Sequence, residues 1–223
     1  MADLACTWLG LSLRSPLVVG ASPLCDTATA ARAFVRAGAG AVVMHSLFEE
    51  QLVAEQLAAH RFFDSHVDTD AEARSFLPET EVFSVAASPM LDRIRALTDT
   101  LDVPVVASLN GVTPGGWTDH ARQLAEAGAA AIELNLYDVA TDLDERGAQI
   151  EQRQLDVVTA VVDAVDVPVS VKLSPFYASV PNFVARIAAS GAAGVVMFNR
   201  FYQPDLDLET LDIDRHLALS TPA

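Results

Sequence analysis

Basic residues are scarce in this chain. Lysine and arginine together number 14 against 30 acidic residues, which leaves a formal net charge of −16 over 223 residues. A field of that sign repels phosphate backbones and anionic lipid headgroups, so nucleic acid and membrane surfaces are not expected as partners. Backbone N–H groups at helix starts would still allow a phosphate-bearing cofactor to bind locally.

Cysteine is also scarce: Cys6 and Cys25 are the only two, and they do not form a CxxC motif. We therefore expect neither a disulfide framework nor a metal site. The chain does not open with a basic stretch followed by an apolar run, as a secretory signal would. No apolar run approaches the roughly 18 residues that suggest a membrane span. These absences predict a cytoplasmic protein.

Short apolar runs rich in β-branched residues recur between longer helix-like stretches, and 51% of the residues are hydrophobic. The runs predict strands over 17–21, 41–45, 104–109, 131–135, 168–173 and 194–199. The stretches between them predict helices over 28–37, 47–59, 116–127, 146–165 and 180–190. We interpret the strands as continuously apolar, which is typical of strands that are covered on both faces. The alternation of strand and helix favours a parallel sheet in a single α/β domain over 1–223.

Similar sequences at the helix-to-strand junctions support this β/α organisation. The junctions AGAGAVV, AGAAAIE and SGAAGVV place glycine just past a helix end, where a left-handed conformation is needed. The segment over 60–87 breaks the pattern with polar, acidic and weakly periodic sequence. So long an excursion in a compact domain is typical of a functional loop, and we predict an inserted loop there.

Polar residues follow the apolar runs directly, at the carboxyl ends of the predicted strands, where parallel β/α folds gather their ligands. This position predicts a site that includes Ser22, His45, Ser46, Asn110, Asn135, Lys172, Ser174 and Asn199.

Lys172 carries the most information, because a lysine at the end of an apolar strand is costly to bury without a partner. It could stabilise an anion, such as a reduced flavin or a phosphate, or lose its proton and form a Schiff base. The amides of Asn135 and Asn199 can both donate and accept hydrogen bonds, which suits the edge of a planar ring. His45 is a candidate general acid or base.

The motifs occur in an order that resembles the dihydroorotate dehydrogenase family. LGLSLRSPLVVGASPL resembles the family's opening strand, and AIELN, PVSVKLSP and GVVMFN resemble its three later strands that end on asparagine, lysine and asparagine. The resemblance implies a (β/α)8 TIM barrel, FMN as the cofactor, oxidoreductase activity and a link to pyrimidine biosynthesis. It also implies that Ala21 and Ser22 contact the cofactor, and that Asn135, Lys172 and Asn199 line its ring.

Three departures from the family pattern predict a different or unknown substrate. His45 stands where the family has a lysine, and the asparagine-rich loop that grips orotate has no counterpart between His60 and Val85. After AIELN the chain reads LYDVATD, without the family's serine or cysteine base, so Tyr137 and Asp138 are candidates by position only.

We find about six of the eight β/α units, because the final units that bind the FMN phosphate have no counterpart. We therefore expect that the sequence is truncated at its C-terminus, and that a truncated chain would be inactive. A homo-oligomer or a completing chain is the alternative, since an open barrel exposes strand edges. Besides the flavin hypothesis, two others remain open: a lyase or aldolase that uses Lys172 as a Schiff base, and a non-catalytic barrel fragment or subunit.

Overall fold

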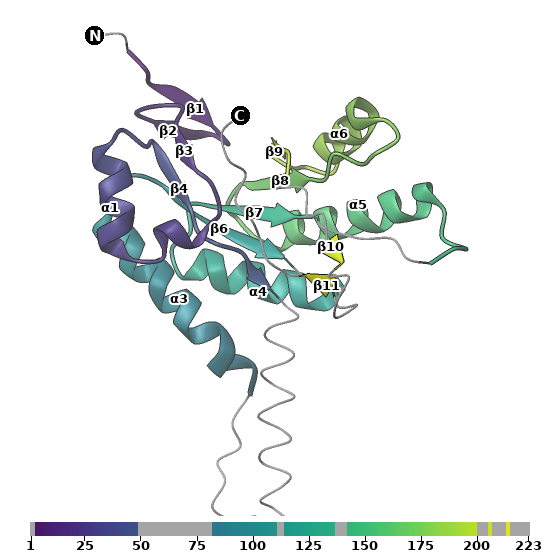
Figure 1. Cartoon of the computed structure of the whole chain (residues 1–223), viewed down its shortest axis with the longest axis horizontal. Coiled ribbons are helices and arrows are strands. Elements are labelled where there is room, and N and C mark those ends of the chain that lie inside the picture. The colour runs from purple at the N-terminus through teal and green to yellow at the C-terminus, as the bar shows by residue number, and fades with distance from the viewer. Residues whose placement is uncertain are drawn as a thin grey trace, which may run out of the picture.

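A computed structural model describes residues 3–48, 82–110, 114–136, 142–199, 205–206 and 213–214. Within these ranges, strands and helices alternate along the chain, and the helices form an arc outside a curled sheet (Figure 1). The predicted alternation is therefore confirmed for the part of the chain that is described.

Seven strands belong to one sheet, which runs in the order β3-β4-β6-β7-β8-β9, with β5 paired to β6. All of its pairings are parallel. The bounds of its strands are β3 Val18–Val19, β4 Ala41–Val43, β5 Leu47–Phe48, β6 Val105–Asn110, β7 Ala131–Asn135, β8 Val169–Leu173 and β9 Gly194–Met197. Two antiparallel pairs lie outside it, namely β1 Cys6–Trp8 with β2 Leu11–Leu13, and β10 Asp205–Leu206 with β11 Ile213–Asp214.

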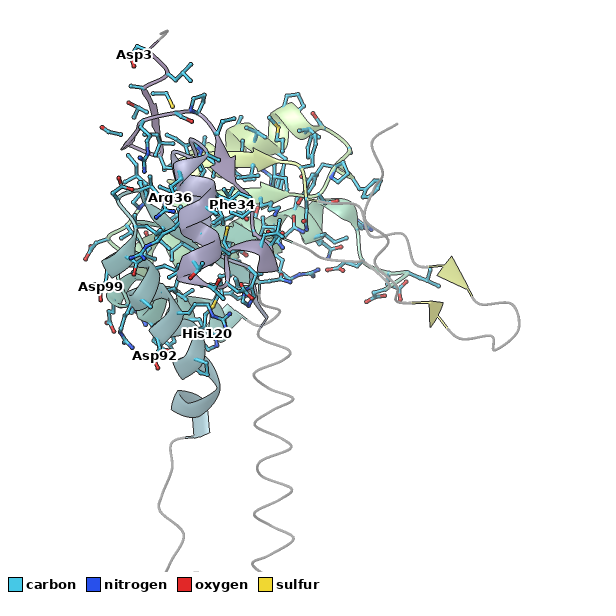
Figure 2. The ribbon with its side chains drawn as sticks, turned by 60° about the vertical axis from the view of Figure 1, so that its left-hand side comes forward. Asp3, Phe34, Arg36, Asp92, Asp99 and His120 are labelled. Atoms are coloured by element: carbon cyan, nitrogen blue, oxygen red, sulfur yellow. The ribbon has the colours of Figure 1, made fainter. Side chains whose placement is uncertain are left out.

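The helices cover one face of this sheet. They are the 3-10 helix η1 Pro23–Cys25 and the α-helices α1 Ala28–Arg36, α3 Val82–Thr100, α4 Pro114–Glu126, α5 Gly147–Ala164 and α6 Val180–Ala189. Buried helix residues such as Ile94, Leu124 and Val158 join the facing strand residues in one apolar core. Exposed acidic side chains, including Asp92 and Asp99 on α3, lie on the solvent side of the helical layer (Figure 2).

Strand order decides between the two common parallel architectures. A doubly wound sheet reverses its strand order at a switch point and carries helices on both faces. Here neighbours in the sheet follow one another in the chain, and the helices pack on one face only, as in a β/α barrel. The described residues therefore form a curled half-barrel of the α/β class.

The β1–β2 hairpin covers the inner face of the sheet near the amino ends of its strands. Its two-residue turn consists of Leu9 and Gly10, with φ angles of 52° and 77°, as a type I′ turn requires. The buried Leu9 side chain clusters with Val43, Val106 and Ala131. Apolar contacts thus fill the amino half of the inner face and leave the carboxyl half outside this cluster.

Glycine ends the helices as the repeated junctions predict. Gly38 follows α1 with a φ of 109°, and Gly128 follows α4 with a φ of 104°. A side chain is strained in that region, so these two positions suit glycine alone.

Two segments differ from the sequence-based expectation. The helix expected over 47–59 is wrong at its start, because Leu47–Phe48 form β5 and pair with β6; its remainder lies outside the described residues. Helix α3 has no counterpart among the predicted helices, and its start at Val82 overlaps only the end of the segment 60–87 that we expected to be a loop. The rest of that segment, 60–81, lies outside the described residues, so the loop stays a prediction there. None of the helices in the described ranges combines the length and apolar character needed to cross a membrane.

Candidate functional site

The strands of the half-barrel are two-faced, which corrects the interpretation that they are apolar throughout. In β6, the outward residues Val105, Ala107 and Leu109 belong to the core under the helices. The inward residues of β6 alternate with these outward residues. Toward the carboxyl end of the strand the inward residues change from apolar Val106 to polar Ser108. Successive side chains of a strand point to opposite faces, so the polar residues gather on the inner face at one end.

Register places the inward residues of neighbouring strands side by side. Ser108 of β6 lies opposite Glu133 of β7, which lies opposite Ser170 of β8. One step further along, Asn135 lies opposite Lys172. The inner face therefore carries a polar surface, which we call the polar edge and define by Ser108, Glu133, Asn135, Ser170 and Lys172.

Glu133 and Lys172 form an ion pair within the polar edge. Lys172 Nζ lies 3.4 Å from Glu133 Oε1, and the lysine and glutamate side chains are 16% and 4% exposed. The pair follows from register, because a residue two positions beyond the directly opposite one is the diagonal neighbour on the same face. A buried carboxylate is costly without a cation or donors, so each charge depends on the other.

Two serines support the carboxylate from the other side. Ser108 Oγ donates to Glu133 Oε1 at 3.4 Å, and Ser46 Oγ lies 2.8 Å from Ser108 Oγ. A hydroxyl has one proton, so Ser46 must donate to Ser108 if Ser108 donates to Glu133. The result is a directed chain from Ser46 through Ser108 to Glu133.

The two predicted asparagines also meet. Asn199 Nδ2 donates to Asn135 Oδ1 at 3.1 Å, which joins the residue after β9 to the end of β7. That bond leaves the Asn135 amide nitrogen and the Asn199 carbonyl oxygen for other partners.

His45 lies at the same end of the sheet but pairs in another direction. Its Nδ1 is 2.5 Å from Asp26 Oδ1, and Arg93 reaches the other Asp26 oxygen at 3.6 Å. The His45 side chain is 32% exposed. Burial raises the pKa of the adjacent Cys25 thiol, and the Asp26 carboxylate adds to that shift, so this thiol remains protonated at neutral pH.

The structure therefore brings part of the predicted site together. Hydrogen bonds and the ion pair connect Ser46, Asn135, Lys172 and Asn199 to one another or to polar-edge partners. Ala21 and Ser22 are half-buried beyond the carboxyl end of β3, and Asn110 shares the inward direction of Ser108. Tyr137 and Asp138 lie outside the described residues.

Sequence reasoning missed Glu133, Ser108 and Ser170. The signal was the period-two placement of polar residues in VVASLN, AIELN and VSVKL, which an alternating strand pattern would have explained.

The polar edge offers one ammonium, one amide, one carboxylate and two hydroxyls over neighbouring strands, and Asn199 after β9 adds a second amide. An ammonium stabilises developing negative charge, and amides bind the edge of a planar heterocycle through both donors and acceptors. The Lys172 ammonium is engaged in the ion pair with Glu133, whereas Schiff-base formation needs a free amine. The arrangement thus suits a planar ligand that carries or acquires negative charge.

Comparison with known proteins finds relatives along most of the chain. The chain is 29% identical over 208 residues to the catalytic subunit of dihydroorotate dehydrogenase B (NAD(+)) of Methanosarcina mazei. The aligned region covers 92% of this chain and 63% of that protein. The corresponding subunit of Bacillus pumilus is 32% identical over 115 residues, or 50% of this chain and 37% of that protein. The chain spans about three fifths of the length of the Methanosarcina relatives.

No protein-family model matches the chain. Among solved structures, a putative phosphonomutase from Burkholderia cenocepacia J2315 superposes with a TM-score of 0.48 and 18% identity, over 81% of this chain and 67% of that one.

Proposed function

We propose that the chain belongs to a dihydroorotate dehydrogenase-like family and acts as an FMN-dependent oxidoreductase on a small molecule, with the described half-barrel as part of a (β/α)8 barrel. The observation that carries the proposal is the placement of Lys172 beside Asn135, with Asn199 bonded to Asn135, at the carboxyl end of a barrel-type sheet. Active sites of such barrels lie at that end.

The donor set of the polar edge fits a flavin ring. Lys172 would hold the part of the ring that becomes negative on reduction, while Asn135 and Asn199 would bind its polar edge. Ala21, Ser22, Ser46 and Asn110 are the further positions that we propose for cofactor contact. When bound, FMN supplies the acceptor for a hydride taken from the substrate.

His45 is the residue we propose for proton transfer, with Tyr137 as a second candidate by position. His45 Nδ1 lies 2.5 Å from Asp26 Oδ1, and in the tautomer that donates from Nδ1 to this carboxylate, Nε2 is the ring nitrogen with a lone pair that can take a proton. The Arg93 guanidinium, 3.6 Å from Asp26, keeps that carboxylate paired from its other oxygen.

Open strand edges support a further partner. Among the described residues, β3 and β9 each have one neighbour in the sheet. Leu17 beside β3 is 61% exposed, and Met197 of β9 is 58% exposed. A second copy or a completing chain would cover these edges, and the molar mass in solution, measured by light scattering, tests for one.

The experiment that tests the flavin is retention of FMN after desalting, read from the visible absorption spectrum. Wild type is expected to retain FMN, and Lys172→Met is expected to bind it at least about tenfold more weakly, because a charged hydrogen bond contributes about 1.5–3 kcal/mol. Arg122→Met is the matched control, since it removes one cation from an exposed pair on α4. A wild type that retains no FMN would refute the proposal.

The same preparation separates the alternative chemistry. Anaerobic addition of dihydroorotate is expected to bleach the flavin if the relatives' substrate is shared. Borohydride trapping with a carbonyl compound reports only on Lys172 and the N-terminal amine, because the chain has no other lysine. Trapping at Lys172 without flavin binding would favour the Schiff-base hypothesis instead.

A further inference from the structure

Lys172 is the sole lysine of a chain whose other basic residues are all arginine. Its ammonium has three protons, and one of them is directed at Glu133 Oε1. Among the described residues, Glu133 is the one ionisable side chain within ion-pair distance of it. The charge that Lys172 presents to a ligand therefore depends on Glu133.

Glu133 is itself fixed in place. Its side chain is 4% exposed, its neighbours in the sheet on either side are Ser108 and Ser170, and Ser108 donates to the same oxygen that Lys172 contacts. Because Ser46 supports Ser108 in turn, the carboxylate is held from the side opposite the lysine. A carboxylate held in this way positions its partner rather than following it.

We propose that Glu133 is a positioning residue that aims the Lys172 ammonium along the polar edge and offsets part of its charge, so that it sets how strongly this edge binds an anionic planar ring. The inference rests on the proposed function insofar as the ring is reduced FMN. Two ammonium protons remain for the ligand, while the carboxylate opposes any second negative charge nearby. Glu133 thus lowers the preference of the site for reduced, anionic flavin over oxidised, neutral flavin.

The first test uses the chain without flavin and measures carbamylation of Lys172 by potassium cyanate, followed by intact mass and peptide mapping. Cyanate modifies the neutral amine, so Glu133→Gln is expected to react at least about fivefold faster than wild type near neutral pH, because the ion pair that favours the ammonium is lost. Glu151→Gln is the control, since it removes the same charge from an ion pair with Arg186. Its rate is expected to match wild type.

The pH profile separates charge from access. If Glu133 acts through charge, the ratio of the Glu133→Gln rate to the wild-type rate is constant near neutral pH and falls to one at alkaline pH, where Lys172 is neutral in both proteins. A ratio that stays above one even at such alkaline pH would show that the substitution merely loosens the packing, and it would overturn the proposal. Equal rates near neutral pH would overturn it as well. Ser108→Ala, which removes a donor but no charge, gives a milder variant in case Glu133→Gln folds poorly, and a smaller acceleration is expected.

The second test measures the midpoint potential of bound FMN by dye equilibration. Glu133→Gln is expected to bind reduced FMN at least tenfold more tightly relative to oxidised FMN, which raises a two-electron potential by about 30 mV. Retained FMN with an unchanged or lower potential would overturn the inference while leaving the flavin proposal intact. FMN that binds to no variant would refute the proposed function, and the cyanate profile would then decide alone whether Glu133 controls Lys172.

Discussion

Lys172→Met is the substitution whose cost the structure defines best. It removes the ammonium and leaves the Glu133 carboxylate buried, with Ser108 as a hydrogen-bond donor. At the observed 3.4 Å, two unit charges attract by about 5 kcal/mol at an effective dielectric constant of about 20. Partial exposure of Lys172 reduces this value, so we expect the free energy of unfolding to fall by about 3 kcal/mol, the lower end for breaking a buried pair.

The double variant Lys172→Met, Glu133→Gln tests whether that cost comes from the stranded charge. Replacing a whole buried pair by neutral residues is often nearly neutral. We therefore expect the double variant to recover at least half of the loss, which corresponds to a coupling energy of at least about 1.5 kcal/mol. Asp119→Asn serves as the control, since its partner Arg122 and Asp119 itself are 51% and 70% exposed, and a surface pair of this kind contributes about 1 kcal/mol or less.

Urea unfolding at neutral pH, followed by circular dichroism, provides the assay, and equal m-values in all variants validate the comparison. A loss below about 1 kcal/mol for Lys172→Met would refute the structural argument. Additivity of the two single substitutions within about 0.5 kcal/mol would do the same, because residues in contact should couple.

Two further outcomes follow from packing and burial. Gly40→Ala is expected to lower the free energy of unfolding by about 2 kcal/mol, because the added Cβ would lie 2.1 Å from the Ser15 carbonyl oxygen. Gly20→Ala is the control and is expected to be neutral, because its Cβ would meet nothing within 4 Å. Equal unfolding midpoints for the two variants would contradict this prediction. Burial raises the pKa of Cys25, so iodoacetamide is expected to modify the half-buried Cys6 first, and mass spectrometry showing Cys25 modified first in the native protein would contradict the burial.

Much of the fold could be predicted because local signals agreed with tertiary structure. The strand predicted over 131–135 is Ala131–Asn135 in the structure, since a helix-ending glycine and a short β-branched run define its start. Helix α3 was harder to predict, because Pro89 lies inside it and proline ordinarily disrupts a helix interior. Its buried residues Met90, Ile94 and Leu97 nevertheless follow helical spacing, so a periodicity test over 90–97 would have found it.

The candidate site could be predicted only in outline. Strand ends point to Lys172 and Asn135, because parallel strands finish at one edge. The contact between Lys172 and Glu133 depends on the register of β7 against β8, which local sequence does not determine. Treating AIELN as apolar throughout also hid Glu133, whose side chain points away from the helix-covered core.

The polar edge is better explained by binding of a ligand than by a contribution to the stability of the fold. The outward residues of the same strands, such as Val171 and Leu134, show that this sheet packs well with apolar side chains. An ion pair on the inner face adds little stability over hydrophobic residues of similar volume, while each charge would be costly without the other. The presence of Lys172 and Glu133 on the inner face is therefore best explained by a ligand that interacts with their charges. The midpoint potential of FMN bound to Glu133→Gln is the measurement that tests whether this ligand is the flavin.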